Sequence, residues 1–484
     1  MPKVLICNTY FYRFDIKQWN NQMPYPPLGT IYAASHLQNL GYEVRFFDNN
    51  LKDDASAIAA TLDEFQPDYF IIYDDGFNYL TKMCLTVMRE ACFTMLSLTK
   101  NQPIKTLVSS SDSTDHYEMY LSKGADVVLL GEAEESLVES LSLLDKQQPL
   151  SNCKGIAFKA TNNEVKVNPR RPVLRDLDSL PPPNWDLICI EDYQSIWKNS
   201  GEEFSLNIAT TRGCPYKCNW CAKPIYGNRY NAHSPAYIVA IIEKLYHDFG
   251  VRRFWMCDDI FGLKPGWVQE FGELLEEKNL TISYYIQSRV DLLLKEDTID
   301  VLAKSGLEEV WLGAESGAQE ILDAMDKGTQ IEDIFTATQL LKKRGVKVAF
   351  FLQFGYLGET KEHIKMTIDM VKKLLPDNIG ISVSYPLPGT KFYDKVKEDL
   401  KFKANWKDSD DLDMMFSGTY DAAYYKRLQR YVHKVFRREQ GINQLKKAFL
   451  QPTNLNADQL KSISKLLYYV PSSFYDKITR FNDL

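Results

Sequence analysis

Three cysteines in one short segment are the residues whose type and spacing most clearly suggest chemistry. Cys214, Cys218 and Cys221 are separated by three and then two residues. Three thiolates at this spacing wrap three corners of a [4Fe–4S] cube and leave the fourth iron without a protein ligand. A structural zinc site requires four closed ligands, usually in two pairs, and the sequence has no second pair. The segment therefore predicts an iron–sulfur cluster with an open coordination position.

The other six cysteines lie far apart, at positions 7, 84, 92, 153, 189 and 257. An odd total of nine in a large chain argues against a disulfide framework, so we expect these six to be isolated core thiols. Cys257 is the one candidate for a fourth ligand. Its place on an expected strand, beside Trp255, favours the core instead.

The cysteine segment follows the first of six runs that read as strands. Helical patterns follow the first five of these runs, and six β/α units fit a partial TIM-like (β/α)6 barrel. The active site of such a barrel lies at the carboxyl ends of its strands, so the cysteines are expected on its first loop. The expected strands are Leu206–Thr211, Arg253–Asp258, Ile282–Gln287, Glu309–Gly313, Val346–Phe354 and Ile379–Tyr385.

The first part of the chain shows a separate alternation of short strands and amphipathic helices. This alternation predicts a doubly wound, Rossmann-like parallel sheet that binds ligands at the carboxyl ends of its strands. The expected strands are Val4–Cys7, Glu43–Phe47, Tyr69–Tyr73, Thr106–Ser109 and Val127–Leu130. The whole chain is therefore expected to be of the α/β class.

Composition shifts along the chain predict four regions. Residues 1–148 form the Rossmann-like domain, 149–200 a linker with a small hairpin, 201–400 the partial barrel, and 401–484 a helical carboxyl-terminal region. The linker contains three consecutive prolines, which make it semi-rigid and extended. The last region interleaves aromatic and basic residues. We expect its aromatics to be core, with closure over a lipid or a tetrapyrrole as the alternative.

Overall charge and hydropathy limit the kinds of partner and location. The 484 residues carry a net charge of −7 without a dense basic stripe, which disfavours a nucleic-acid partner. The amino terminus lacks the apolar core of a signal peptide, and no apolar run is long enough to cross a bilayer. We expect a cytoplasmic protein with no integral membrane segment.

The cysteine segment resembles the signature of the radical S-adenosylmethionine (SAM) superfamily, in which an aromatic residue stands just before the last cysteine. Residues resembling the family's other motifs follow at successive strand ends, across residues 150–400. In this family SAM chelates the open iron and is cleaved to a 5′-deoxyadenosyl radical. The resemblance implies cofactor contacts from Trp220, Asp258, Gln287, Arg289, Gly313, Glu315 and Ser316.

The first domain resembles the cobalamin-binding domains that are joined to radical SAM barrels. The resemblance implies cobalamin contacts from Leu28, Gly29, Ser110, Gly131 and Glu132. Many such domains carry a histidine after the first strand that binds cobalt from below, but residues 8–17 contain none, and His36 fits an ordinary helical position. Either cobalamin binds without a protein ligand below cobalt, or the domain keeps the fold and has lost the cofactor.

Together these resemblances imply a cobalamin-dependent radical SAM enzyme that C-methylates an unactivated carbon of a small-molecule substrate. It would use a reductant such as flavodoxin or ferredoxin. An oxidative cyclase or another radical reaction without methyl transfer is the first alternative, and a non-catalytic cobalamin sensor is the second. RNA methylthiolation is disfavoured by the acidic balance. The sequence singles out no catalytic side chain or particular substrate.

Overall fold

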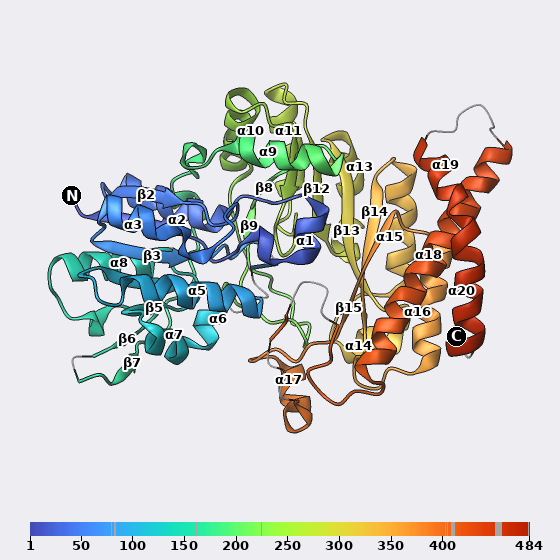
Figure 1. The fold of residues 1–484 in the computed structure, drawn as a ribbon. Helices are drawn as coiled ribbons and strands as arrows, with labels where there is room; N and C mark the ends of the chain where they lie inside the picture. The colour runs from blue at the N-terminus through green and yellow to red at the C-terminus, as the bar shows by residue number, and fades with distance from the viewer. Residues whose placement is uncertain are drawn as a thin grey trace. The chain divides into compact units, whose positions relative to one another are not determined.

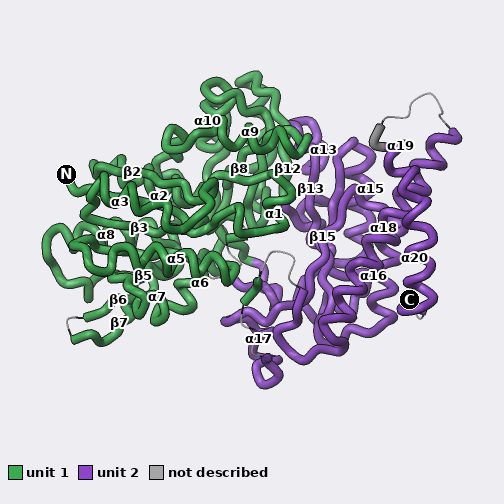
Figure 2. Tube along the Cα trace, in the orientation of Figure 1, with its two compact units in different colours: residues 1–215, 223–286, 404–411 green, residues 216–222, 287–403, 412–484 purple. Residues whose placement is uncertain are grey.

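The computed structural model describes residues 1–484 apart from 79, 82, 83, 161, 224, 402, 404, 408–411, 451–456 and 483. The chain divides into two compact units, which Figure 2 colours separately. The first unit consists of residues 1–215, 223–286 and 404–411, and the second of residues 216–222, 287–403 and 412–484. The chain therefore crosses between the units several times.

A seven-stranded sheet forms the base of the first unit, in the order β2-β1-β3-β4-β5-β6-β7 (Figure 1). The neighbours among the first five strands run parallel, and β6 and β7 are added antiparallel at one edge. The strands are β1 (Lys3–Cys7), β2 (Glu43–Phe47), β3 (Tyr69–Tyr73), β4 (Lys105–Ser109), β5 (Val127–Leu129), β6 (Ile156–Lys159) and β7 (Val165–Val167).

Alternating residues of this sheet build its core. Val4 and Ile6 of β1, with Ile71 of β3, pack against apolar residues of α2 and α8 such as Leu37 and Leu137. Side chains alternate between the two faces of a strand, so these residues share one face, and the residues between them are buried on the other face. The helices of this region are α1 (Ile16–Asn21), α2 (Leu28–Asn39), α3 (Ala59–Phe65), α5 (Thr86–Thr99), α6 (Ser111–Asp115), α7 (Tyr117–Lys123), α8 (Glu134–Asp145) and α9 (Ile190–Ser200).

The first unit also holds the start of the second strand series. Strand β11 pairs in parallel with β8 and with β12, while β9 and β10 form a separate antiparallel pair. The elements are β8 (Leu206–Ile208), β9 (Thr211–Arg212), β10 (Asn231–Ala232), α10 (Pro235–Asp248), β11 (Arg253–Met256), α11 (Trp267–Glu277) and β12 (Ser283–Ser288).

The second unit continues the strand series and carries the carboxyl-terminal helices. Strand β14 pairs in parallel with both β13 and β15. The elements of the series are α12 (Val290–Leu293), α13 (Thr298–Lys304), β13 (Leu307–Glu315), α14 (Gln319–Ala324), α15 (Ile331–Lys343), β14 (Lys347–Phe354), α16 (Lys361–Leu374), β15 (Asn378–Val383) and α17 (Lys391–Val396). The terminal helices are α18 (Ala422–Leu450), α19 (Ala457–Ser464) and α20 (Leu466–Arg480).

The structure confirms the predicted α/β class, with two series of parallel strands and a helical end. Three details differ from the predictions. The expected strand Leu206–Thr211 ends at Ile208, because the amides of Thr210 and Thr211 donate to Asp258 instead of to a neighbouring strand. The expected linker hairpin extends the first sheet as β6 and β7. Cys189 is exposed, whereas the other five isolated cysteines are buried as expected.

Candidate functional site

The three predicted cluster ligands lie on the loop between β9 and β10. Cys214, Cys218 and Cys221 form no disulfide, and their side chains are half-buried. Within the described residues, no three or more His, Cys, Asp or Glu side chains are gathered closely enough to hold a metal ion. Three thiols on one loop nevertheless suit, as a donor set, three corners of a [4Fe–4S] cluster. The assignment of these ligands therefore stays a prediction from their type and spacing.

Asp258 fixes the entry to this loop within the first unit. It follows β11, is buried, and its Oδ1 accepts hydrogen bonds from the amides of Thr210 and Thr211 at 2.7 Å each. Its Oδ2 accepts from the Thr210 hydroxyl at 2.7 Å. Burial raises the pKa of Asp258 to about 7, although these hydrogen bonds oppose the rise. The carboxyl group predicted to contact SAM thus holds the segment before Cys214.

Arg212, two residues before Cys214, joins the same segment to the end of the first sheet. Its Nη1 lies 2.7 Å from Glu132 Oε1, and its Nη2 lies 2.9 Å from Glu134 Oε1. All three side chains are almost fully buried. Burial, the largest effect, would raise the pKa of Glu134, but Arg212 together with hydrogen bonds from the backbone and from Tyr73 lowers it. Glu132, predicted to contact cobalamin, thus already forms an ion pair with Arg212.

Within the second unit, Asn219 anchors the part of the loop between Cys218 and Cys221. Its amide nitrogen Nδ2 donates to the Ala324 carbonyl at 2.7 Å, and its Oδ1 accepts from the Tyr356 hydroxyl at 2.7 Å. Its backbone amide donates to the Met325 carbonyl at 2.9 Å. Asn219 is buried, so these bonds replace the water that its polar atoms have lost.

Arg289 supports the loop from β12 and α12 through Tyr216. Its guanidinium carbon lies 3.8 Å from the centre of the Tyr216 ring, a cation–π contact. Its Nε donates to Asp291 at 2.9 Å, and its Nη1 donates to the Lys327 carbonyl at 2.8 Å. The arginine that was predicted to pair with SAM therefore already has protein partners for several of its donors.

A buried ion pair stands at the end of β13, where the resemblance places SAM contacts. Lys327 Nζ lies 2.7 Å from Glu315 Oε1, and both side chains are buried. Burial favours the neutral lysine, but Glu315 and Cys218 outweigh it and raise the pKa of Lys327. Gly313 makes room for this pair, because a Cβ at this position would lie 2.6 Å from Lys327 Nζ.

The remaining residues predicted to contact SAM occupy different environments. Ser316 is fully buried, and its hydroxyl lies 3.3 Å from the Thr367 hydroxyl of α16. Its position therefore serves packing between β13 and α16. Gln287 and Trp220 are half-buried. The indole nitrogen of Trp220 is buried and has no hydrogen-bond partner among the described residues.

A small cavity of about 20 Å³ lies at the carboxyl ends of β3, β4 and β5. Gly29, Ser110 and Gly131, all predicted to contact cobalamin, line it, while Leu28 is buried at the start of α2. The strand order β2-β1-β3-β4-β5 has its topological switch point at β1 and β3, where such sheets bind ligands. The predicted residues therefore meet at the expected edge of the sheet.

Gly29 and its neighbours test whether this edge suits a nucleotide-like ligand. The Gly29 amide donates to Asp75 at 3.1 Å, and a Cβ at Gly29 would lie 3.1 Å from the same carboxyl oxygen. Glycine at position 29 thus permits the close approach of the Asp75 carboxylate. However, Ile225 and Tyr226 also line the cavity, whose volume is that of about one water molecule. The small and polar lining residues suit a nucleotide-like ligand. Binding such a ligand requires the side chains of Ile225 and Tyr226 to move.

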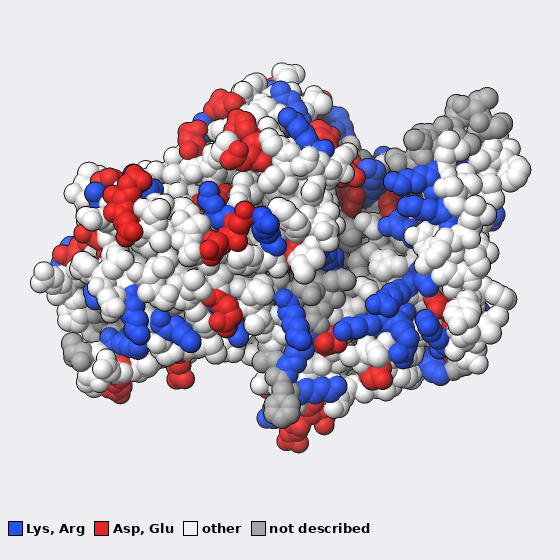
Figure 3. Space-filling view, viewed as in Figure 1, with Lys and Arg blue, Asp and Glu red and all other residues white. Residues whose placement is uncertain are grey.

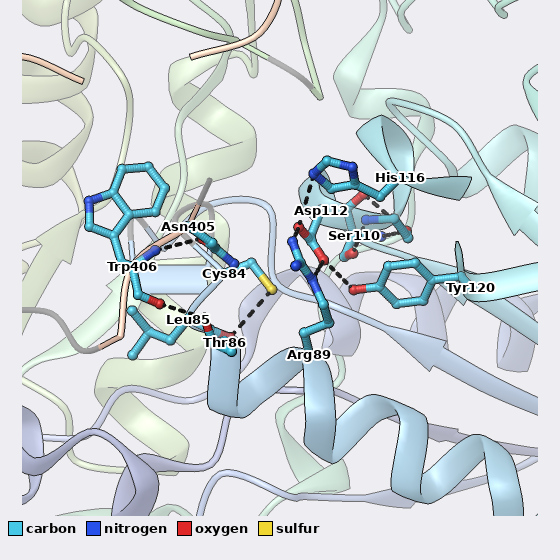
Figure 4. Close-up of polar contacts among 11 residues, drawn as sticks. Cys84, Leu85, Thr86, Arg89, Ser110, Asp112, His116, Tyr120, Asn405 and Trp406 are labelled. Atoms are coloured by element: carbon cyan, nitrogen blue, oxygen red, sulfur yellow. Dashed lines mark hydrogen bonds and ion pairs between the residues drawn. The ribbon is translucent and has the colours of Figure 1, made fainter. Parts of the chain in front are cut away.

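Most of the segment from Ser109 to Thr114 belongs to the short helix α6. Ser110 caps it, since its hydroxyl accepts from the Ser113 amide at 2.8 Å. Asp112 of α6 accepts hydrogen bonds from Arg89 and Tyr120 and lies 3.9 Å from His116, as Figure 4 shows. These contacts fix the orientation of α6 and hence of Ser110.

Four residues that make contacts in or beside the site were not identified from the sequence: Arg212, Tyr216, Asn219 and Lys327. Three of them lie within or next to the cysteine segment, and this closeness in sequence could have identified them as site residues. No sequence signal identifies Lys327, because its partner Glu315 lies twelve residues away across α14. In the part of the chain that the structure describes, no helix combines the length and the apolar character needed to cross a bilayer.

With this geometry established, comparison with known proteins defines the class. Residues 208–371 match the radical SAM superfamily. This match spans β8 to α16 and includes the cysteine loop. Residues 208–371 therefore form a radical SAM domain, and a Rossmann-like sheet precedes it in the chain.

Individual relatives show which proteins this enzyme resembles. It is 27% identical over 389 residues to an uncharacterized methyltransferase of Pyrococcus horikoshii, covering 79% of this chain and 81% of the relative. It is also 27% identical to the anaerobic magnesium-protoporphyrin IX monomethyl ester cyclase of Rubrivivax gelatinosus, covering 78% and 67%. The structure of OxsB, a cobalamin-dependent SAM radical enzyme with aqua-cobalamin bound, superposes with a TM-score of 0.74 at 17% identity, covering 98% and 72%. This last likeness establishes the shared fold.

Proposed function

We propose that this protein is a cobalamin-dependent radical SAM enzyme that methylates an unactivated carbon of a small-molecule substrate. The observation that carries the proposal is the cysteine loop, which has three thiols at cluster spacing and is positioned by contacts of Asp258, Arg289 and Asn219. Such support is what a cluster loop requires, since ligands must keep their geometry while the cluster changes charge. The similarity to a methyltransferase and the fold shared with OxsB support the reaction and the second cofactor.

The residues near the loop divide into three proposed roles. Cys214, Cys218 and Cys221 hold the cluster, and Asp258, Arg289 and Asn219 position the loop that carries them. Trp220, Gln287, Gly313 and Glu315 remain the proposed SAM contacts, with Lys327 fixing the Glu315 carboxylate. When bound, the cluster supplies the electron that cleaves SAM, and cobalamin supplies the methyl group.

In the first domain, Gly29, Ser110 and Gly131 are the proposed cradle for the tail of cobalamin. Residues 8–17, which follow β1, contain no histidine, and His36 lies within α2. We therefore propose that cobalamin binds here without an imidazole below cobalt. A reductant such as flavodoxin or ferredoxin and a cytoplasmic location complete the proposal.

An oxidative cyclase reaction is the second candidate, because the cyclase relative is as similar in sequence as the methyltransferase. The two reactions differ in what becomes of SAM. Methyl transfer consumes a second SAM and yields S-adenosylhomocysteine together with 5′-deoxyadenosine. Cyclisation forms no S-adenosylhomocysteine.

The test uses full-length protein purified anaerobically with cobalamin supplied, then given SAM and a chemical reductant. A corrinoid absorption band beside the broad cluster shoulder shows both cofactors. Liquid chromatography with mass spectrometry then measures the two SAM products. The Cys214→Ala/Cys218→Ala/Cys221→Ala variant is expected to lose both products, and the exposed Cys189→Ala variant is the matched control that keeps them.

Each outcome decides a different part of the proposal. Deoxyadenosine without S-adenosylhomocysteine contradicts methyl transfer and favours the cyclase reaction. An absent corrinoid band contradicts cobalamin binding. Products that persist in the triple cysteine variant contradict the cluster assignment itself.

A further inference from the structure

Helix α20 is inverted in polarity, because it buries polar residues and exposes apolar ones. Ser473 and Asp476 are the residues of α20 that are buried. Asp476 lies 2.5 Å from Lys434 Nζ of α18, and the Ser473 hydroxyl accepts from Arg438 Nη1 of α18 at 3.1 Å. A helix of a globular protein ordinarily turns its apolar face toward the core. Helix α20 instead attaches to α18 through these polar contacts along its length, with apolar packing at its two ends: Leu466 lies against Gly441, and Phe481, just after the helix, stacks on Tyr431 at 4.8 Å.

The opposite face of α20 is apolar and open to solvent. Leu467, Phe474 and Ile478 are 86%, 62% and 58% exposed. Their spacings of seven and four residues place them on one side of the helix. Other large apolar residues of α18, α19 and α20 are also exposed: Phe449, Leu450, Leu460, Tyr468, Val470 and Tyr475. A set of this size marks an interaction surface, since scattered single residues would need no explanation. We call the exposed side chains of Leu467, Phe474 and Ile478 the outer face.

The chain around the outer face is strongly basic, although the whole protein is acidic. Residues 422–484 contain twelve Lys and Arg against four Asp and Glu, a formal charge of +8. Because the total is −7, residues 1–421 carry −15. Figure 3 shows Lys and Arg side chains gathered over α18, while the surface over α20 is largely uncharged. Such a charge asymmetry indicates a polyanionic partner for the terminal helices.

A basic cavity in the same unit adds to this pattern. It has a volume of about 470 Å³ and lies between the ends of α15 and α16 and the helices α18 and α19. Four cationic side chains line it, against one carboxylate, Asp377: these are Lys342, Lys347, Arg437 and Lys447. Lys447 also lowers the pKa of Lys342, whose largest perturbation is burial, so the two cations lie near one another. An anionic headgroup or phosphate would relieve this repulsion.

We propose that the outer face of α20 docks onto the surface of an anionic lipid bilayer, with the basic residues of α18 and α19 contacting the headgroups. Exposed leucine, phenylalanine, isoleucine and tyrosine flanked by Lys and Arg are the composition of helices that lie in the membrane interface. A second copy of the chain is a poorer occupant, because two surfaces of charge +8 would repel one another. The proposal is independent of the reaction proposed above.

The test is flotation of the full-length protein with vesicles of phosphatidylcholine alone and of phosphatidylcholine containing about one quarter phosphatidylglycerol. The protein is expected to float with the anionic vesicles and to remain behind with the neutral ones. In the Leu467→Ser/Phe474→Ser/Ile478→Ser variant the partition coefficient for anionic vesicles should fall about tenfold or more, because the outer face then has no apolar side chain to insert. These side chains are exposed, so circular dichroism should show an intact fold.

The matched control changes three exposed apolar residues of the first unit, as Ile16→Ser/Met119→Ser/Val167→Ser. It is expected to bind vesicles like the unchanged protein. The charge reversal Lys461→Glu/Lys465→Glu should weaken binding to anionic vesicles, since both lysines are exposed on α19 and just before α20.

Three results would overturn the proposal. The unchanged protein fails to float with anionic vesicles, or the outer-face variant floats as well as the unchanged protein. Alternatively, sedimentation velocity shows an oligomer that the outer-face variant converts to a monomer, while neither protein binds vesicles. That last outcome would assign the outer face to contact between copies of the chain.

Discussion

At the scale of single residues, the site depends on charged groups that are buried together with their partners. Arg212 lies between two glutamates and beneath aromatic rings, with the Phe77 ring centre 5.3 Å from its guanidinium carbon. Lys327 and Glu315 form a second buried pair in the other unit. Buried pairs add little net stability, but removing one partner is costly because the other charge stays buried alone.

Arg212→Met is therefore expected to destabilise the protein by about 3–5 kcal/mol, because Glu132 and Glu134 lose their cation in a buried site. Arg212→Lys should recover part of this loss, since it restores one positive charge. Urea denaturation of the apoprotein measures both. The control is Arg45→Met, which removes an exposed pair with Glu64 and should cost less than about 1 kcal/mol. Equal effects of the Arg212 and Arg45 changes would contradict the role given to Arg212.

Glu359 provides a prediction for the dependence of stability on pH. Burial raises its pKa to about 8, and its Oε2 accepts from the Gly355 amide at 2.7 Å. Between about pH 4.5, the ordinary value, and pH 8 the folded protein holds a proton that the unfolded chain has released. The contribution of this group to stability therefore falls as pH rises through that range.

Glu359→Gln, which imitates the protonated carboxyl group, should leave stability nearly unchanged near pH 5. Near pH 8.5 it should raise the free energy of unfolding by about 2–4 kcal/mol over the unchanged protein. Denaturation at the two pH values measures the difference. Glu332→Gln, at an exposed position on α15, is the control that should show no such pH dependence. A Glu359→Gln protein with the pH dependence of the unchanged protein would contradict the raised pKa.

At the scale of elements, the loop from Gly213 to Tyr230 is the part whose shape decides the site. Gly213 has φ of +78°, and a Cβ there would lie 2.3 Å from the Arg229 carbonyl oxygen, so the start of the loop requires glycine. Beyond it, Tyr216 and Asn219 attach the loop to residues of the second unit. A loop without secondary structure thus keeps its form through side-chain contacts.

Asn219→Ala should loosen this loop, since the Tyr356 hydroxyl and the Ala324 carbonyl lose a buried partner. The expected cost is about 1–3 kcal/mol, together with a lower iron and sulfide content after anaerobic reconstitution. The electron paramagnetic resonance spectrum of the reduced cluster should also broaden. Lys217→Ala changes an exposed residue of the same loop and should preserve both the iron content and the spectrum. A full iron content in Asn219→Ala would show that the loop keeps its form without this anchor.

At the scale of the whole molecule, the two units share the chain in an interleaved way, so neither is a contiguous segment. The helical end belongs to the second unit, but its helices differ in what they bury. Helix α18 buries six large apolar side chains: Tyr425, Leu428, Tyr431, Val432, Val435 and Phe436. Helix α20 buries only Ser473 and Asp476.

A chain ended after Leu450 should therefore fold and melt cooperatively, with a modest loss of thermal stability. A chain ended after Tyr420 should fail to fold, because burying each lost apolar side chain contributes about 1.5–3 kcal/mol and total stabilities are only about 5–15 kcal/mol. Calorimetry and soluble yield distinguish the two. Loss of folding on removing α19 and α20 alone would show that α20 contributes to the core.

The expectation that the terminal aromatics are core was correct for the first part of α18 and wrong for the last turn of α18 and for exposed residues of α20. Tyr431 and Phe436 of α18 are buried, whereas Phe449 and Tyr468 are exposed. Helical periodicity identifies two faces of a helix, but it does not state which face meets the protein. In α20, Asp476 pairs with Lys434 of α18, so the polar face of the helix lies against α18.

The sequence alone determined the fold class, the strand order along the chain and the three cysteines, because periodicity and ligand spacing are local properties. Tertiary structure decided how the predicted side chains are used. Asp258, Glu132 and Arg289 are charged residues at strand ends, as a ligand site requires, yet each holds a protein group from a distant segment. Such pairings depend on which segments folding brings together. The type of a residue shows which groups it can bind, whereas only the folded structure shows which protein groups it contacts.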